Sequence, residues 1–188
     1  VEAGLVHGDV AVLIMEPALT NIGIVLPDEG FLQAVRELCT KYGTLLLIDE
    51  THTISSGLGG YTRVHSLRPD IFVVGKCVAG GMPTAVWGLT DETATRYEAA
   101  NAQREPGRSG MGTTLSANPM QFACLVATLG EVMTPDNYSH MEKLAERLSH
   151  GLARIIDKRK APWHVVRVGA RVEFICAPGP LRNGSEAG

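Results

Sequence analysis

This sequence of 188 residues lacks long hydrophobic runs, clusters of basic residues and paired-cysteine motifs. Its apolar stretches, such as residues 10–15, are much shorter than the ~18 residues of a membrane-spanning helix. The net charge is −3 and no basic run is present, so nothing in the composition points to nucleic acid or to an anionic membrane. We therefore expect a protein that binds neither membranes nor nucleic acids.

Cysteines are few and widely spaced. The chain has four of them, Cys39, Cys77, Cys124 and Cys176, and they form no C-x-x-C pair. This usage is typical of reduced thiols and predicts a cytoplasmic protein. Cys77 directly follows Lys76, and a buried packing role is favoured there over a reactive thiol.

Two short apolar runs end in residues that can do chemistry. Residues 45–49 read LLLID and residues 71–76 read IFVVGK. Neither run alternates between apolar and polar residues, so both predict strands that are covered on both faces of a parallel sheet. Ligands of such sheets bind at the carboxyl ends of the strands, where Asp49 and Lys76 both lie. Pyridoxal phosphate requires these two groups, an amine for a Schiff base and an acid as partner of its pyridine nitrogen.

The segment before Asp49 predicts one parallel strand–helix–strand unit. Residues 10–15 form a first apolar strand that ends at Glu16, Pro27 and the acids after it mark the start of a helix, and Gly43 ends that helix. Because parallel strands end on the same edge of a sheet, we expect Glu16 and Asp49 on one rim. Glu16 is interpreted as a structural acid rather than a catalyst.

Downstream of Asp49 the pattern predicts loops, strands and amphipathic helices. Residues 51–61 and 104–114 are rich in Gly, Ser or Thr and are expected to be loops. Expected strands are 71–76, 85–89, 163–168 and 171–176, and expected helices are 91–103, 118–133 and 138–160. Pro135 is expected to stop the helix before it. Strands that alternate with helices in this way indicate an α/β protein.

Three other kinds of site compete for the same residues. The string DETH at 49–52 resembles the D-E-x-H of an ATP-driven helicase, but that class needs an earlier G-x-x-x-x-G-K-[ST] phosphate loop, which is missing. On an extended segment Glu50 and His52 would point away from Asp49, so we expect no metal site. No G-x-G-x-x-G follows a strand, so a dinucleotide site lacks its fingerprint. Asp49 alone would most simply cap the next loop and Lys76 alone would be a surface lysine, so the prediction depends on the pair.

Four ordered blocks together resemble a known family. They read IMEP at 14–17, LIDE at 47–50, VGK at 74–76 with GGMP at 80–83, and GTTLSANP at 112–119. The chain is similar to the class III (ω-type) aminotransferases, in particular to the glutamate-1-semialdehyde 2,1-aminomutase branch. The resemblance implies fold type I of the pyridoxal-phosphate transferases, with part of the large, mostly parallel α/β domain in residues 1–134 and the beginning of a small α+β domain in 135–188. Members of the family are longer, so the chain is expected to be a fragment.

The resemblance also implies roles for individual residues. Lys76 matches the lysine that binds pyridoxal 5'-phosphate as a Schiff base and shuttles a proton. Asp49 matches the acid that keeps the pyridine nitrogen protonated. Thr51 stands where a small residue packs on the face of the cofactor ring. His52 is either a hydrogen-bond partner of the ring hydroxyl or a histidine that only supports its neighbours.

Two further regions follow from the resemblance. Thr113 and Thr114 match the block that contacts the cofactor phosphate across a dimer interface. Asn21 either approaches the ring hydroxyl or the substrate, or makes a turn in its loop. Ala117 stands where the family usually has glycine.

The implied function is that of an enzyme that uses pyridoxal 5'-phosphate, through a Schiff base on Lys76, to move an amino group between an amine or amino acid and a carbonyl compound. An alternative is an aminomutase of the glutamate-1-semialdehyde kind, which transfers the amino group within one molecule and uses the same residues. A rival from another class is an inactive fragment or a non-catalytic dimerisation module that keeps the fold without binding cofactor. The implied partners are a small-molecule amino donor, a carbonyl acceptor and a second copy of the chain in a homodimer.

Overall fold

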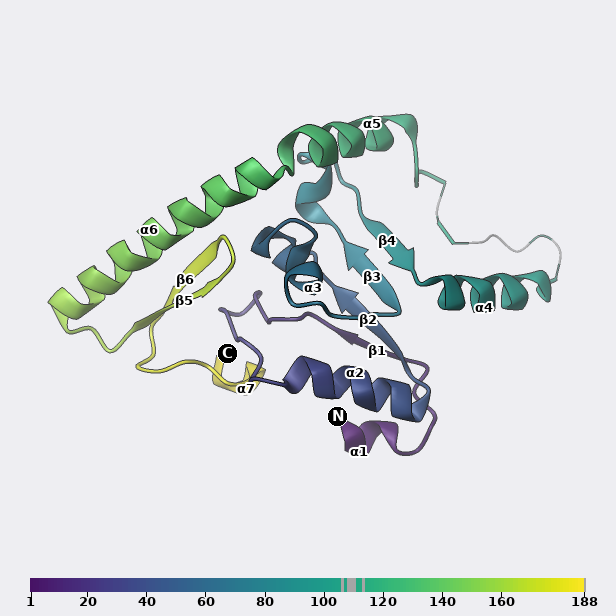
Figure 1. Ribbon diagram of the computed structural model, residues 1–188, viewed down its shortest axis with the longest axis horizontal. Helices are drawn as coiled ribbons and strands as arrows, with labels where there is room; N and C mark the ends of the chain where they lie inside the picture. Colours follow the sequence, from purple (N-terminus) through teal and green to yellow (C-terminus); the bar gives the residue numbers. More distant parts are fainter. Residues whose placement is uncertain (106, 108–110, 113, 188) are drawn as a thin grey trace.

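The computed structural model describes residues 1–105, 107, 111–112 and 114–187. Its centre is a four-stranded sheet in the order β1-β2-β3-β4, in which the first three strands are parallel and the last is antiparallel. The strands are β1 (Val12–Met15), β2 (Leu45–Asp49), β3 (Ile71–Val74) and β4 (Val86–Leu89). This mostly parallel sheet with helices around it confirms the predicted α/β class (Figure 1).

Helix α2 (Phe31–Tyr42) connects β1 to β2 and forms the core on one face of the sheet. Val35 and Cys39 of the helix are buried against Leu46 and Ile48 of β2. Because both strands of this unit are parallel, their carboxyl ends lie on the same edge of the sheet.

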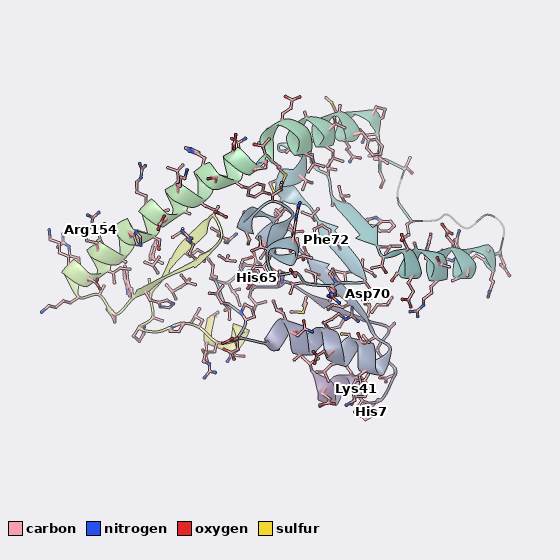
Figure 2. All side chains as sticks on the ribbon, viewed as in Figure 1. His7, Lys41, His65, Asp70, Phe72 and Arg154 are labelled. Atoms are coloured by element: carbon pink, nitrogen blue, oxygen red, sulfur yellow. The ribbon has the colours of Figure 1, made fainter. Side chains whose placement is uncertain are left out.

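The remaining elements are mainly helical. They include α1 (Glu2–Leu5), α4 (Asp91–Ala102), α5 (Pro119–Ala127), the π-helical turn η3 (Thr128–Val132), α6 (Pro135–Arg159), β5 (His164–Val168), β6 (Arg171–Ile175) and α7 (Gly184–Ala187). The long helix α6 lies along an antiparallel hairpin of β5 and β6 (Figure 1). Outward side chains of α6, such as Arg154, extend away from the rest of the molecule (Figure 2). Each helix in the described part of the chain is too short or too polar to span a bilayer.

Two helix boundaries differ from the sequence-based expectation. Helix α2 begins after Gly30 rather than at Pro27, because Gly30 has a φ of 78° and this left-handed conformation interrupts the helix. Pro135 begins α6 rather than stopping α5. Proline fits the first turn of a helix because its missing N–H has no intrahelical partner there, and the side chain of Thr134 caps the same turn by accepting the N–H of Asn137.

The segment 51–61, expected as a loop, is partly helical. It contains the 3-10 helix η1 (Thr53–Ser56) and the start of the short helix α3 (Gly60–Val64). The extended path assumed for residues 49–52 is also wrong, because the backbone turns directly after Glu50. Burial of the Glu50 side chain is the physical reason for both corrections.

Glu50 is fully buried, with 0% of its surface exposed. Its carboxylate accepts a hydrogen bond from the hydroxyl of Thr53 at 2.6 Å and further hydrogen bonds from the backbone N–H groups of Tyr61 and Thr62. A buried carboxylate is costly unless donors surround it. These donors reach Glu50 only because the chain folds back around it, so the acid organises the turn between β2 and α3.

The second half of the chain contacts the segment after β2 through η1. The hydroxyl of Tyr138 in α6 donates to the backbone oxygen of Ile54 at 2.9 Å. The N–H of Ala170, in the turn of the β5–β6 hairpin, donates to the oxygen of Ser55 at 3.3 Å. The predicted division into two domains after residue 134 stays a prediction.

Candidate active site

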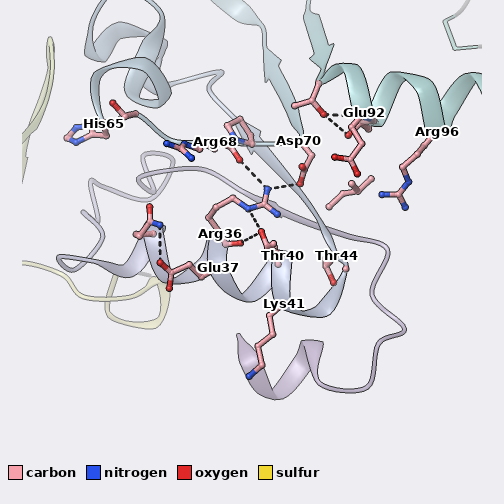
Figure 3. Close-up of a pocket in the computed structure, with 18 residues that line it drawn as sticks. Arg36, Glu37, Thr40, Lys41, Thr44, His65, Arg68, Asp70, Glu92 and Arg96 are labelled. Carbon is pink, nitrogen blue, oxygen red and sulfur yellow. Dashed lines mark hydrogen bonds and ion pairs between the residues drawn. The ribbon is translucent and has the colours of Figure 1, made fainter.

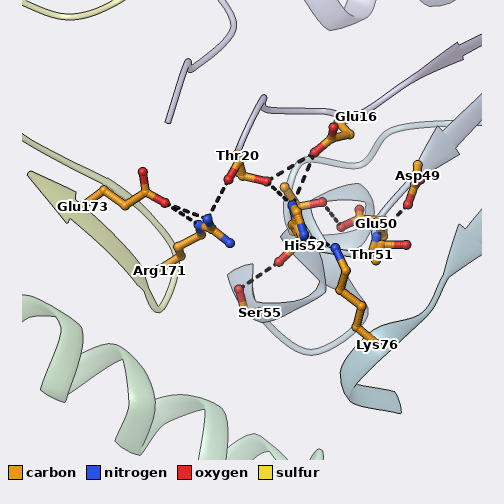
Figure 4. Close-up of polar contacts among 11 residues, drawn as sticks. Glu16, Thr20, Asp49, Glu50, Thr51, His52, Ser55, Lys76, Arg171 and Glu173 are labelled. Atoms are coloured by element: carbon orange, nitrogen blue, oxygen red, sulfur yellow. Dashed lines mark hydrogen bonds and ion pairs between the residues drawn. The ribbon is translucent and has the colours of Figure 1, made fainter. Parts of the chain in front are cut away.

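Lys76 follows the end of β3 and opens the 3-10 helix η2 (Lys76–Ala79). The strand was expected to reach Lys76, but it ends at Val74. Lys76 has a φ of 53°, in the left-handed region that residues other than glycine seldom adopt. Such conformations cost on the order of 1–3 kcal/mol and cluster at functional sites. This turn lets the exposed lysine reach across to His52 (Figure 4).

Cys77 is exposed, although a buried packing role was expected. The helical turn of η2 buries Val78 and Ala79 instead. Partial desolvation nevertheless raises the pKa of the Cys77 thiol. A raised pKa lowers the thiolate fraction, which argues against a reactive thiol at this position.

A chain of polar contacts runs from Lys76 back to the end of β1 (Figure 4). Nζ of Lys76 contacts Nε2 of His52, and Nδ1 of His52 lies 2.7 Å from Oγ1 of Thr20. The Thr20 hydroxyl donates to Oε2 of Glu16 at 3.2 Å, and the same carboxylate oxygen is 3.7 Å from Nδ1 of His52. Glu16, interpreted from the sequence as structural, is therefore linked to the lysine through two side chains.

The surroundings of His52 keep its imidazole neutral at neutral pH. Burial is the main cause that lowers the pKa of His52, followed by the positive charges of Lys76 and Arg171. The carboxylates of Glu16 and Asp49 act in the opposite direction without outweighing them. Charged side chains of both signs therefore contribute to the electrostatic environment of this ring.

Asp49 ends β2 and pairs with Val73 of the neighbouring strand. Its Oδ1 accepts the backbone N–H of Thr51 at 2.8 Å. Asp49 and Glu16 both line a hollow of about 580 Å³ beside β1. The prediction that the two acids share one rim of the sheet is confirmed.

These residues fit pyridoxal phosphate. Lys76 supplies an exposed amine, and Oδ2 of Asp49 has no protein donor within the described residues, so it is available to a protonated ring nitrogen. The Thr51 hydroxyl lies 3.7 Å from the position that a Cβ would take at Gly75, so its side chain faces the end of the strand that leads to Lys76. The assignment of Lys76, Asp49, Thr51 and His52 to the cofactor stays a prediction.

The other predicted cofactor residues are not part of this cluster. Thr113 lies outside the described residues. Thr114 and Asn21 are exposed in turns, and neither has a hydrogen bond to Lys76 where the structure describes the chain. Their roles stay predictions. Ala117 has a φ of 57°, which explains why glycine is usual at this position in the family.

A second hollow, of about 1080 Å³, lies at the opposite ends of β2 and β3 (Figure 3). It is lined by Leu45, at the start of β2, and by Asp70, directly before β3. Nη1 of Arg36 lies 2.7 Å from Oδ2 of Asp70, and the same oxygen accepts the N–H of Leu46 at 2.7 Å. These contacts attach α2 to the sheet, and the hollow is on the edge away from Lys76.

Comparison with known proteins agrees with this geometry. The family model described as "Aminotransferase class-III" matches residues 2–176. The chain belongs to the class III aminotransferase family. The family predicted from the four sequence blocks is therefore confirmed.

Relatives of this class III chain are named as aminomutases. The crystal structure of a glutamate-1-semialdehyde-aminomutase from Pseudomonas aeruginosa PAO1 is similar, with a TM-score of 0.93 and 48% identity, and the match covers 99% of this chain and 42% of that one. A variant of that protein in complex with PMP is similar to the same degree, with a TM-score of 0.93, 47% identity and the same coverage. Glutamate-1-semialdehyde 2,1-aminomutase 2 of Brevibacillus brevis is 35% identical over 176 residues, which are 93% of this chain and 40% of the relative. The chain thus spans about 40% of the length of the curated relatives that it matches.

Two residues near His52, Thr20 and Arg171, were not predicted from the sequence. Thr20 is fully buried, and its backbone oxygen accepts a hydrogen bond from Nη2 of Arg171 at 2.6 Å. Arg171 also forms an ion pair with Glu173 at 2.6 Å. Thr20 and Arg171 are 151 positions apart in the chain, so no sequence motif connects them. Only the approach of the β5–β6 hairpin to the loop after β1 brings them together.

Proposed function

We propose that the protein is a pyridoxal-phosphate enzyme that moves an amino group between an amine or amino acid and a carbonyl compound. The observation that carries the proposal is that β2, which ends at Asp49, pairs in parallel with β3, which is followed by the exposed Lys76, so that both residues lie at the carboxyl end of the sheet. Membership in the class III family and the similarity to a structure in complex with PMP support it.

Each residue has a distinct task in this proposal. The bound cofactor supplies an electron sink for the negative charge that develops at the substrate carbon. Lys76 would hold the cofactor covalently through Nζ, and its amine would take up and return the proton at the substrate carbon. Asp49 keeps a proton on the ring nitrogen, because its negative charge favours the protonated form. Thr51 would pack beside the ring.

A second candidate is transfer of the amino group within one molecule, as in glutamate-1-semialdehyde 2,1-aminomutase. The names of the Pseudomonas aeruginosa and Brevibacillus brevis proteins, at 48% and 35% identity, favour it. Incubation with a single substrate separates the two reactions. An aminomutase rearranges glutamate-1-semialdehyde without a partner compound, whereas an aminotransferase needs a separate carbonyl acceptor.

We also propose a homodimer in which Thr113 and Thr114 contact the cofactor phosphate across the interface. The exposed apolar residues of α5 support an interface near this segment: Met120, Phe122 and Val126 are 60%, 53% and 73% exposed. A cytoplasmic location fits the cysteines, which are all free.

The test is a comparison of Lys76→Ala with Lys158→Ala, a matched change of an exposed lysine on α6. The parent and Lys158→Ala are expected to gain a visible absorbance band with pyridoxal phosphate and, after borohydride, a stable mass increase on the peptide that carries Lys76. Lys76→Ala should show neither. A parent chain without the band, or a Lys76→Ala variant with normal turnover, would refute the proposal, and the first result would favour the inactive-fragment rival.

A further inference from the structure

The contacts of Thr20 determine which ring nitrogen of His52 carries hydrogen. A threonine hydroxyl has one proton to donate, and Thr20 donates it to Oε2 of Glu16, a carboxylate that can only accept. The 2.7 Å contact between Oγ1 of Thr20 and Nδ1 of His52 therefore takes its proton from the imidazole. Nδ1 carries the hydrogen, and Nε2 presents its lone pair to Nζ of Lys76.

The opposite tautomer would be disfavoured at both ends of the ring. An N–H at Nε2 would face the N–H groups of Lys76, so the contact would join two donors. A lone pair at Nδ1 would face the Glu16 carboxylate, whose oxygen is 3.7 Å away. Electrostatics and hydrogen bonding thus select the same tautomer.

The hairpin of β5 and β6 contacts the surroundings of His52 at two points. Arg171 binds the backbone oxygen of Thr20 at 2.6 Å. In the hairpin turn, a Cβ at Gly169 would lie 2.2 Å from Cα of Ser56, so the turn packs directly on the backbone of η1, just after His52. The same hairpin therefore contacts Thr20, which touches the imidazole, and the helical turn that follows His52.

We propose that His52 accepts a proton from Nζ of Lys76 as this amine bonds to a carbonyl carbon, and that Thr20 and Glu16 are positioning residues that fix the required tautomer. The proposal rests on the proposed function, because it concerns the same lysine. The ammonium of Lys76 first gives one proton to water, which leaves a neutral amine with a lone pair. The carbon–nitrogen bond then forms, the nitrogen loses one further proton to Nε2, and the carbonyl oxygen takes up one proton from water. The imidazolium then returns its proton to water.

The charges around His52 are compatible with this role. Burial, Lys76 and Arg171 lower the pKa of His52, while Glu16 and Asp49 oppose them, so Nε2 remains unprotonated and able to accept at neutral pH. When the ring takes up a proton, the positive charge forms beside the Glu16 carboxylate, which accepts from Thr20. The lone pair of Nε2 is therefore available before the proton transfer, and the Glu16 carboxylate compensates the charge of the imidazolium after it.

The first measurement is the tautomer of His52 in the purified protein without pyridoxal phosphate. Long-range proton–nitrogen NMR distinguishes the two ring nitrogens, and the signal that disappears in His52→Gln identifies the residue. We expect hydrogen on Nδ1 in the parent and in Thr20→Ser, which keeps the hydroxyl. Thr20→Val has the same shape without the hydroxyl and should lose this preference.

The second measurement is the rate at which a small aldehyde, acetaldehyde, is fixed on Lys76 by cyanoborohydride at neutral pH, followed by peptide mass spectrometry. Thr20→Val and His52→Gln should react roughly tenfold more slowly than the parent and Thr20→Ser. This tenfold decrease in rate is smaller than the usual contribution of general-base catalysis, because water also reaches the exposed amine and can accept the proton.

Hydrogen on Nε2 in the parent would overturn the proposal, and this outcome does not depend on whether a variant folds. The proposal would also be overturned if Thr20→Val and Thr20→Ser had the same His52 tautomer and the same rate of acetaldehyde fixation on Lys76. Both readouts are taken without cofactor. A parent that shows the expected tautomer and rates but no absorbance band with pyridoxal phosphate would refute only the proposed function.

Discussion

The hydroxyl of Tyr138 in α6 donates a hydrogen bond to the backbone oxygen of Ile54, 2.9 Å away and 84 positions earlier in the chain. Both residues are buried, and burial raises the pKa of Tyr138 to about 12, so the phenol remains a donor at neutral and moderately alkaline pH. In Tyr138→Phe the buried oxygen of Ile54 would lose its donor. We expect the free energy of unfolding, measured with urea, to fall by about 1–3 kcal/mol.

Tyr97→Phe is the matched control for this prediction. Tyr97 is half-buried on α4, and its hydroxyl has no hydrogen bond among the residues that the structure describes. The same chemical change should therefore alter the free energy of unfolding by no more than about 0.5 kcal/mol. Equal losses in the two variants would show that the Tyr138 hydrogen bond does not attach α6 to η1.

Gly169 in the β5–β6 turn combines a left-handed backbone with direct contact to another segment. Its φ is 55°, and an added Cβ would lie 2.2 Å from Cα of Ser56, which cannot move independently of the backbone. Gly169→Ala should reduce the free energy of unfolding by roughly 3 kcal/mol, from strain and overpacking together. Gly8→Ala is the control for backbone strain alone, because Gly8 has a φ of 69° and open space around it. Its free energy of unfolding should fall by only about 1 kcal/mol. Similar decreases in the free energy of unfolding for Gly169→Ala and Gly8→Ala would mean that the hairpin turn does not pack against η1.

The sheet and the pair Asp49 and Lys76 can be predicted from sequence for a physical reason. Strands that are covered on both faces must be apolar throughout, so β2 and β3 stand out as uninterrupted apolar runs. The run of β2 ends in Asp49, and that of β3 is followed after one glycine by Lys76. The carboxyl ends of neighbouring parallel strands lie on one edge of the sheet, so the two charged residues are expected on that edge without further information.

The contacts around His52 cannot be predicted in this way. The hydrogen bond from Arg171 to Thr20 depends on how a distant hairpin packs, and the turn after β2 depends on burial of Glu50. The start of α6 is a different case, because a signal was present. Thr134 followed by Pro135 is typical of a capped helix start, and it competed with the equally valid pattern of a proline that ends a helix.

The lowered pKa of His52 predicts a pH dependence of stability. The unfolded chain binds a proton on this histidine at a pKa of about 6.5, whereas the folded chain binds it only at lower pH. As the pH falls below about 6.5, the unfolded state gains a proton first, so the folded state loses stability until the folded pKa is reached. His52→Gln removes this titration. Its free energy of unfolding should therefore fall less than that of the parent when urea denaturation is repeated from about pH 7.5 down to about pH 5. Parallel pH curves for the two proteins would contradict the direction of the shift.

Asp49→Asn tests the acid independently of the lysine. Asparagine has nearly the same shape and its amide oxygen can still accept the N–H of Thr51, so the fold around β2 should persist. Its neutral side chain no longer favours a proton on the ring nitrogen, and an unprotonated ring is a poor electron sink. We expect turnover to fall by several orders of magnitude while borohydride still fixes the cofactor on Lys76, because the amine is unchanged. Asp157→Asn, on the exposed end of α6, should match the parent in both assays. Turnover of Asp49→Asn within a few-fold of the parent would show that a different group protonates the ring nitrogen, and that the end of β2 is not where the cofactor ring is held.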